Sequence, residues 1–156
     1  MVELKELKKE YNKFCEKYSL PSFEELDNAF EVSCVEHKEF LLREARRKIA
    51  ERLEIVAKFL EELLQPDQTL ANLHECRKIT EDDKKRIFDL YRKLMMLCRY
   101  SFELDLVCSE EKDASFIKDV FKEWKELKNE ILDYVKKAEE SWKDVEFTEE
   151  ELEYLG

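Results

Sequence analysis

Glycine and proline are almost absent from this 156-residue sequence: glycine occurs once, as the last residue, and proline twice, as Pro21 and Pro66. Tight β-hairpin turns need backbone angles that glycine adopts most easily, so hairpins of that kind are excluded. Phosphate-binding loops need glycine so that the backbone can approach the ligand, which excludes P-loop and dinucleotide-binding motifs. The chain must therefore be built from elements that do without glycine, and its wealth of Glu, Lys and Leu favours long helices.

Histidine is also scarce, and the cysteines follow no pattern. The two histidines are His37 and His74, and the five cysteines have irregular spacing without a CxxC pair. An odd, irregular set of cysteines does not form a disulfide framework, so we expect reduced thiols and a cytoplasmic protein. Nucleophilic catalysis needs a nucleophile beside an activating base, and no local signature supplies one. We therefore predict that the protein is not an enzyme, with no catalytic residue and no cofactor.

One group of residues raises the question of a metal site. Cys34 and His37 are three residues apart, so both face the same way if they lie on a helix. Cys108 falls near them if a later helix runs antiparallel to the first, and zinc would still need a fourth ligand, such as Cys15. Scattered cysteines on apolar faces are usually core residues, so we predict no metal; metal analysis of the purified protein decides the question.

Long apolar runs are missing as well, so no segment is expected to span a membrane. The N-terminus is charged from residue 3, which argues against a signal peptide. Charged residues make up 43% of the chain, but apolar residues make up 44% and include ten Phe and two Trp, so the chain is expected to fold. High Lys and Glu content with one glycine fits a thermophilic source.

The most regular stretch of the sequence is 35–64, which holds neither glycine nor proline. Its apolar residues recur at intervals of three and four, which predicts one long amphipathic helix. At 1.5 Å per residue that helix would be on the order of 45 Å long. We interpret it as the central helix of the fold.

Capping patterns and apolar periodicity place the other helices. Ser22 with Glu25 forms an S-x-x-E capping box, Ser33 with Glu36 forms a second one before the central helix, and Thr80 precedes a third helix. Four long helices are predicted over 2–19, 35–64, 81–108 and 110–142, and two short ones over 23–31 and after Thr148. Residues 65–79 are predicted to form an irregular connection that packs on the bundle and has room for one helical turn. The predicted fold is an all-α, mostly antiparallel bundle around the central helix, and residues 1–156 form a single domain.

The same periodicity predicts the most deeply buried core. These residues are Ile49, Leu53, Val56, Leu94, Leu97, Trp124 and Ile131. Arg46 lies at the edge of the apolar stripe of the central helix, and Asp105 lies on the inner face of the 81–108 helix. A partly buried arginine usually finds a carboxylate, so we single out Arg46 and Asp105 as candidates for a semi-buried ion pair. If Asp105 does not reach Arg46, Glu103 or an acid of the last helix would take its role. The other alternative is that Arg46 extends along its methylene groups to solvent.

Charge is distributed unevenly along a chain whose net charge is −11. Residues 77–100 hold eight basic and four acidic residues, whereas residues 101–156 hold eight basic and eighteen acidic residues. A candidate contact patch consists of Arg77, Lys78, Lys84, Lys85, Arg92, Lys93 and Arg99. Single-strand binders place aromatic side chains between such cations, and no interleaving of that kind is predicted here.

These observations favour a non-enzymatic acidic helical bundle that acts as an interaction or adaptor module with a protein partner. Homo-oligomerisation is left open. The alternative is a factor associated with RNA or a ribonucleoprotein through the patch around residues 77–99. A salt-dependent RNA titration separates the two functions.

Overall fold

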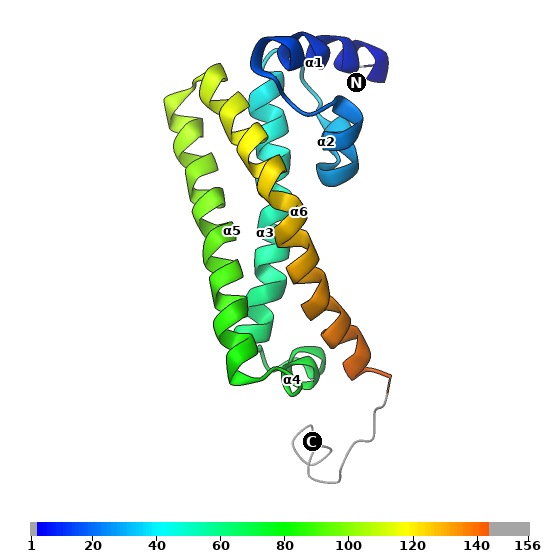
Figure 1. Cartoon of the computed structure of the whole chain (residues 1–156), viewed down its shortest axis with the longest axis vertical. Coiled ribbons are helices and arrows are strands. Elements are labelled where there is room, and N and C mark those ends of the chain that lie inside the picture. Colours follow the sequence, from blue (N-terminus) through cyan, green and yellow to red (C-terminus); the bar gives the residue numbers. More distant parts are fainter. Residues whose placement is uncertain (1–2, 144–156) are drawn as a thin grey trace. The chain divides into compact units, whose positions relative to one another are not determined.

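The computed structural model describes residues 3–143, of which 82% are helical, and it contains no strand within that range (Figure 1). The prediction of an all-α fold is therefore confirmed. The elements are α1 (Leu4–Tyr18), α2 (Phe23–Phe30), the 3₁₀ helix η1 (Val32–Cys34), α3 (Leu41–Leu64), α4 (Leu70–Cys76), α5 (Glu81–Val107) and α6 (Glu110–Ser141). The final turn predicted after Thr148 lies outside the described residues.

The chain forms two compact units. Unit 1 comprises Met1–Val56 and Lys93–Lys125, and unit 2 comprises Ala57–Arg92 and Glu126–Gly156. Helices α3, α5 and α6 each contribute residues to both units. The single domain stays a prediction.

In unit 1, α5 runs antiparallel to α3. Cys98 of α5 lies beside the Ala50 carbonyl, while Arg46, one turn earlier in α3, contacts Asp105 later in α5. The turn from α5 to α6 is short. The rings of Tyr100, seven residues before the end of α5, and of Phe116, six residues after the start of α6, are 6.0 Å apart. Helix α5 therefore packs antiparallel to both α3 and α6 in this unit, and the short turn after α5 dictates the second pairing.

Helices α1 and α2 complete unit 1 (Figure 1). Pro21 separates them, and the Tyr11 hydroxyl donates to the Pro21 carbonyl at 3.0 Å. Helix α2 begins with the predicted capping box, since Ser22 accepts from the backbone N–H of Glu25 and the Glu25 carboxylate accepts from the backbone N–H of Ser22. The ring of Phe30 packs against Trp124 of α6 at 5.3 Å, which anchors α2 in the core of this unit.

The predicted start of the central helix is wrong. Helix α3 begins at Leu41, and residues 35–40 are not helical. Ser33 does not cap it; the backbone N–H of Ser33 donates to the Asp27 carboxylate at 2.6 Å, and η1 ends at an extended Val35. This path buries both Val32 and Val35, and the gain from burying them outweighs the local preference for a capped helix.

The core prediction is right for Ile49, Leu53, Leu94 and Ile131, which are buried. It is wrong for three residues, Val56, Leu97 and Trp124, which are only half-buried. Periodicity identifies the inner face of a helix, but residues at the edges of that face are covered only where a neighbouring helix reaches them.

Unit 2 is held by contacts between its parts of α5 and α6. The Lys137 ammonium donates to both oxygens of Asp83 at 2.8 and 2.9 Å, and Arg86 pairs with Glu130. Asp83 also accepts from the Thr80 backbone N–H, while the Thr80 hydroxyl accepts from the backbone N–H of Asp83. The predicted cap of α5 at Thr80 is therefore present.

The connection predicted to be irregular contains a helix, α4, whose start is capped by Thr69. The His74 ring lies 4.3 Å from that of Trp142, and Glu75 accepts from the Trp142 indole N–H at 3.0 Å. The Cys76 thiol lies 3.3 Å from the carbonyls of Glu62 and Leu63. These contacts make the segment a packed part of unit 2. Among residues 3–143, no helix is both long enough and apolar enough to cross a bilayer.

Candidate functional site

Arg46 is the centre of a buried ion-pair network in unit 1. Its side chain is 0% exposed, although it is charged, so it is more deeply buried than predicted. Its Nε–H donates to Asp113 at 2.7 Å, and Nη1 donates to the carbonyl and the hydroxyl of Ser101 at 2.5 and 2.6 Å. Nη2 donates to Asp105, the partner considered from the sequence. The network links α3, α5 and α6.

Arg47 adds a second cation at the exposed side of the same network. Its Nε–H donates to Asp105 at 3.0 Å, and its Nη1 donates to Glu44 at 2.8 Å. Asp105 therefore lies between two guanidinium groups. Burial alone would raise the pKa of the Asp105 carboxyl, but the hydrogen bonds and charges of Arg46 and Arg47 outweigh it and leave the pKa below its usual value.

The pKa of the Asp113 carboxyl is shifted in the opposite direction from that of Asp105. Burial raises the pKa of the Asp113 carboxyl, and the hydrogen bond and charge of Arg46 only partly offset this. The nearby charge of Asp105 raises it further. Asp113 differs from Asp105 because its side chain is only 4% exposed and because Arg46 is its one hydrogen-bond donor in the network.

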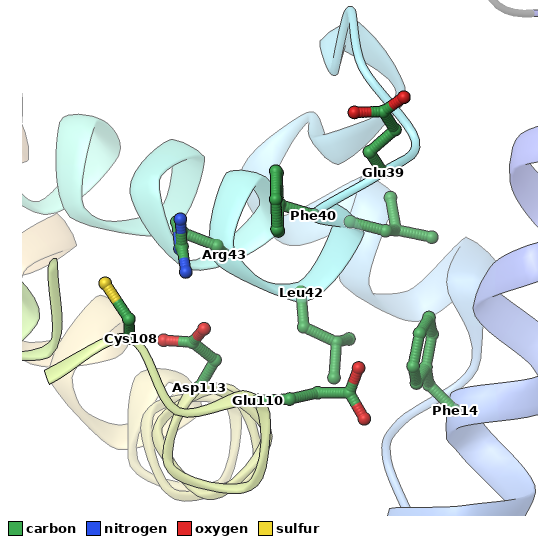
Figure 2. A pocket seen from close by; sticks show the side chains of 9 residues that line it. Phe14, Glu39, Phe40, Leu42, Arg43, Cys108, Glu110 and Asp113 are labelled. Atoms are coloured by element: carbon green, nitrogen blue, oxygen red, sulfur yellow. The ribbon is translucent and has the colours of Figure 1, made fainter.

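An open pocket of about 240 Å³ lies next to this network. Figure 2 shows Arg43, Cys108 and Asp113 on one side of it, and Phe14 and Glu110 on the other. The Arg43 guanidinium lies 4.7 Å from the centre of the Phe40 ring, and its Nε is buried without a hydrogen-bond partner within the described residues. The pocket thus combines one cation, three carboxylates, a thiol and apolar walls.

Most polar groups that line this pocket already have partners within unit 1. Glu110 is occupied by the Tyr18 hydroxyl at 2.8 Å and the Lys17 ammonium at 3.1 Å, and the Tyr18 hydrogen bond is the main reason why its pKa is lowered. The Cys108 thiol donates to the Asp105 carbonyl at 3.2 Å, and neither histidine lines the pocket. Asp113, Glu110 and Cys108 are therefore each engaged in a hydrogen bond within unit 1.

The residues considered for a metal do not come together as such a site. Cys34 lies in η1 and His37 in the non-helical segment before α3, so they do not share a helical face. Cys34 lines a different pocket from Cys108, and Cys15 donates its thiol to the Pro21 carbonyl. Residues 3–143 contain no group of three or more His, Cys, Asp and Glu side chains that could hold a metal ion.

The structure divides the predicted basic patch. Arg77 and Lys78 follow α4, Lys84, Lys85 and Arg92 belong to the unit 2 part of α5, and Lys93 and Arg99 belong to its unit 1 part. Within unit 2, Lys84 pairs with Glu81 at 2.8 Å, whereas Lys85 and Arg92 are seven residues apart and so lie on one face of α5.

The prediction that no aromatic side chain lies between the cations is wrong at Phe88. This residue lies between Lys85 and Arg92 in the sequence, and its side chain is 54% exposed.

Large apolar side chains are exposed on the unit 1 part of α5. Met96, Phe102 and Leu106 are 66%, 62% and 75% exposed, and Tyr100 and Val107 are also exposed. This surface was not predicted. Its signal in the sequence is residues 102–106, Phe-Glu-Leu-Asp-Leu, in which apolar and acidic residues alternate; on a helix this alternation puts apolar side chains on two sides.

Asp113 of α6 is an acid of the last helix, the alternative partner considered for Arg46, although the sequence did not single out this residue. It lies four residues before the buried Ile117, in line with the apolar stripe of α6, and a carboxylate in that position is the signal that reveals it.

Comparison with known proteins identifies no relative of this chain: no family model matches it, and no curated protein or solved structure matches it.

Proposed function

We infer that the chain is a non-enzymatic interaction module and that α5 carries its contact surface. The exposure of Met96, Phe102 and Leu106 is the observation that supports this proposal. A solvated helix face is normally polar, and grouped exposed apolar side chains mark sites where a partner binds. Covering them would contribute about 25 cal/mol for each Å² of apolar surface removed from water.

Affinity purification of the full chain from its source cells tests this function. The native chain is compared with the double variant Phe102→Ser/Leu106→Ser and with the control Leu132→Ser, which changes an exposed apolar residue of α6. We expect at least one protein to be retained by the native chain and by the control and to be lost with the double variant. An identical set of proteins for all three chains would rule out this surface as the site of interaction.

An RNA-associated role is the second candidate, and Phe88 is the observation that favours it. An exposed aromatic ring between Lys85 and Arg92 is an arrangement on which a base could stack while phosphates meet the cations. Titration with single-stranded RNA at two salt concentrations tests it. RNA binding predicts an affinity that falls with salt and is lost in Lys85→Glu/Arg92→Glu. The net charge of −11 makes this the weaker candidate.

A further inference from the structure

One face of α5 in unit 1 repeats at the spacing of a coiled-coil seam. Met95, Arg99, Phe102 and Leu106 follow one another at intervals of four, three and four residues, which places them along one line of the helix. We call these four residues the α5 stripe. Met95 is half-buried and the other three are exposed.

The α5 stripe is separate from the core of unit 1. Leu94, Cys98, Ser101 and Leu104 form the inner face of the same part of α5, and all four are buried. Cys98 and Ser101 contact α3, which shows where this inner face points. Helix α5 is therefore apolar on two sides, and only one of them is covered within the described residues.

Arg99 gives the α5 stripe its charge. It is exposed and forms no ion pair in the described part of the chain, unlike Arg46 and Arg47 on α3. In the sequence, Lys85 and Arg92 precede it at intervals of seven, so a cation recurs at the same heptad position. An arginine enclosed between two helices is stabilised when a carboxylate accepts its hydrogen bonds. The occupant of the stripe therefore needs an Asp or Glu opposite Arg99.

A second copy of the chain fits the stripe less well. The stripe itself contains no carboxylate, so a symmetric pair of stripes would place Arg99 against apolar side chains or another cation. Each copy also carries a net charge of −11, which opposes self-association. The heptad spacing of the apolar residues matches the side-chain rows of a helix, which favours a helical partner over RNA.

We propose that the α5 stripe binds an amphipathic helix of a partner protein, with apolar residues at its a and d positions and an acidic residue that faces Arg99. The proposal rests on the proposed function and specifies the chemistry of its partner. Apolar contacts with Phe102 and Leu106 supply most of the affinity, and the ion pair with Arg99 sets the register of the two helices.

Fluorescence anisotropy with a labelled synthetic peptide tests the proposal. The probe is a three-heptad helix with Leu at most a and d positions, Glu at the central a position and Glu at the flanking positions; a second peptide carries Arg at the central a position. We expect Arg99→Glu to weaken binding of the first peptide by about tenfold or more and to bind the second peptide better than the native chain does. The control Lys122→Glu reverses an exposed cation of α6 and should leave both affinities unchanged.

Several results would overturn the proposal. The acidic peptide could bind the native chain and Arg99→Glu with the same affinity, or it could show no saturable binding to either chain; each result rules the proposal out. Another is sedimentation of the native chain as a dimer that Phe102→Ser converts to a monomer, which would assign the stripe to a second copy. Single-stranded RNA that binds the native chain and is lost in Arg99→Glu would assign it to nucleic acid.

Affinity purification separates a failure of this proposal from a failure of the proposed function. If cellular proteins are lost with Leu106→Ser but retained with Arg99→Glu, the α5 interaction surface is supported and the acidic partner helix is rejected. If the proteins are retained with both variants, both the interaction surface and the acidic partner helix are rejected. Circular dichroism of each variant must match the native chain, as expected because all the changed side chains are exposed.

Discussion

Arg46 shows how a charged side chain can belong to a core. The group is completely buried, and its donors meet Asp105, Asp113 and Ser101. Removing a guanidinium and two carboxylates from water costs several kcal/mol per ion, and only good geometry with satisfied hydrogen bonds offsets that cost. The network therefore adds little net stability, but breaking it is costly, because a charge would remain buried without its partner.

Replacement of Arg46 should strongly destabilise the protein. In both Arg46→Ala and Arg46→Met, Asp113 would stay buried without its cation, and we expect a loss of about 3–5 kcal/mol in the free energy of unfolding. Urea unfolding measures this loss. The matched control is Arg52→Met, which removes an exposed pair with Glu31 and should cost about 0–1 kcal/mol.

A second substitution identifies the cause of that loss. Adding Asp113→Asn to Arg46→Met removes the unpaired charge, so part of the stability should return. If Arg46→Met has the same free energy of unfolding as the native chain, the buried network does not contribute to stability, and only the packing of the Arg46 methylene groups matters at this position.

The two carboxylates of the network should respond to pH in opposite directions. The pKa of Asp105 is lowered from 3.8, so its contribution to stability is present above that pH and is lost as the pH falls through its value in the folded protein. The pKa of Asp113 is raised from 3.8, so its contribution is complete below that pH and is lost as the pH rises through its folded value.

Urea unfolding across the acid range tests this opposition with two variants. The stability cost of Asp105→Asn should shrink as the pH falls below 3.8, and that of Asp113→Asn should shrink as the pH rises above 3.8. Asp119→Asn, which changes an exposed residue of α6, serves as the control for general acid destabilisation. Parallel pH trends for the two network variants would contradict the assigned pKa shifts.

At the scale of the helices, the lack of glycine has a visible consequence. Three residues that follow helices, Ser19, Glu31 and Cys108, adopt the left-handed conformation with φ of 55°. Glycine is usual at this position because a side chain there clashes with the backbone. Helices α1, α2 and α5 therefore end with residues that are held in place at some cost in free energy.

Ser19→Gly should accordingly stabilise the protein. Glycine removes the steric cost of the left-handed conformation, and its greater freedom in the unfolded chain offsets part of the gain, which leaves about 0.5–1 kcal/mol. Thermal unfolding measures the change. Ser19→Ala keeps the Cβ atom and should bring no gain, so equal effects of the two substitutions would show that the conformation of residue 19 is not strained.

For the whole molecule, the sequence predicted the helix class and most helix boundaries because each helix carries its own local signals. Helices α2, α5 and α6 begin where the sequence places them, and at α2 and α5 the predicted cap is the reason. The start of α3 was not predictable in this way, because Ser33 and Glu36 look like a cap locally. The contact of Ser33 with Asp27 and the burial of Val35 decide the path, and both depend on tertiary packing.

Prediction of the candidate site had the same limit. Arg46 and Asp105 could be named as potential partners because Arg46 lies at the edge of an apolar stripe and Asp105 lies on an inner helix face. The sequence does not give the offset between the two helices: equal counting from Leu64 and Glu81, the ends of the connection, would place Arg46 opposite Arg99, whereas Arg46 contacts Ser101 and Asp105. The offset between two helices is set by side-chain packing, which periodicity does not record. The exposed side of α5 was missed because the apolar period was used only to identify the inner face of that helix.

Core burial gives the prediction that tests the arrangement of helices in unit 1. Leu53 of α3 is completely buried, and Leu53→Ala should lower the free energy of unfolding by about 2–5 kcal/mol, since the cavity it leaves cannot fully close. Leu97→Ala should cost less, because Leu97 is only half-buried. Ile55→Ala changes a residue of the same helix that is 65% exposed and should stay within about 0.5 kcal/mol of the native chain. Urea unfolding of the three variants ranks them directly. A cost below about 1 kcal/mol for Leu53→Ala would mean that this face of α3 is open, and the contact surface would then have to be sought on α3 instead of α5.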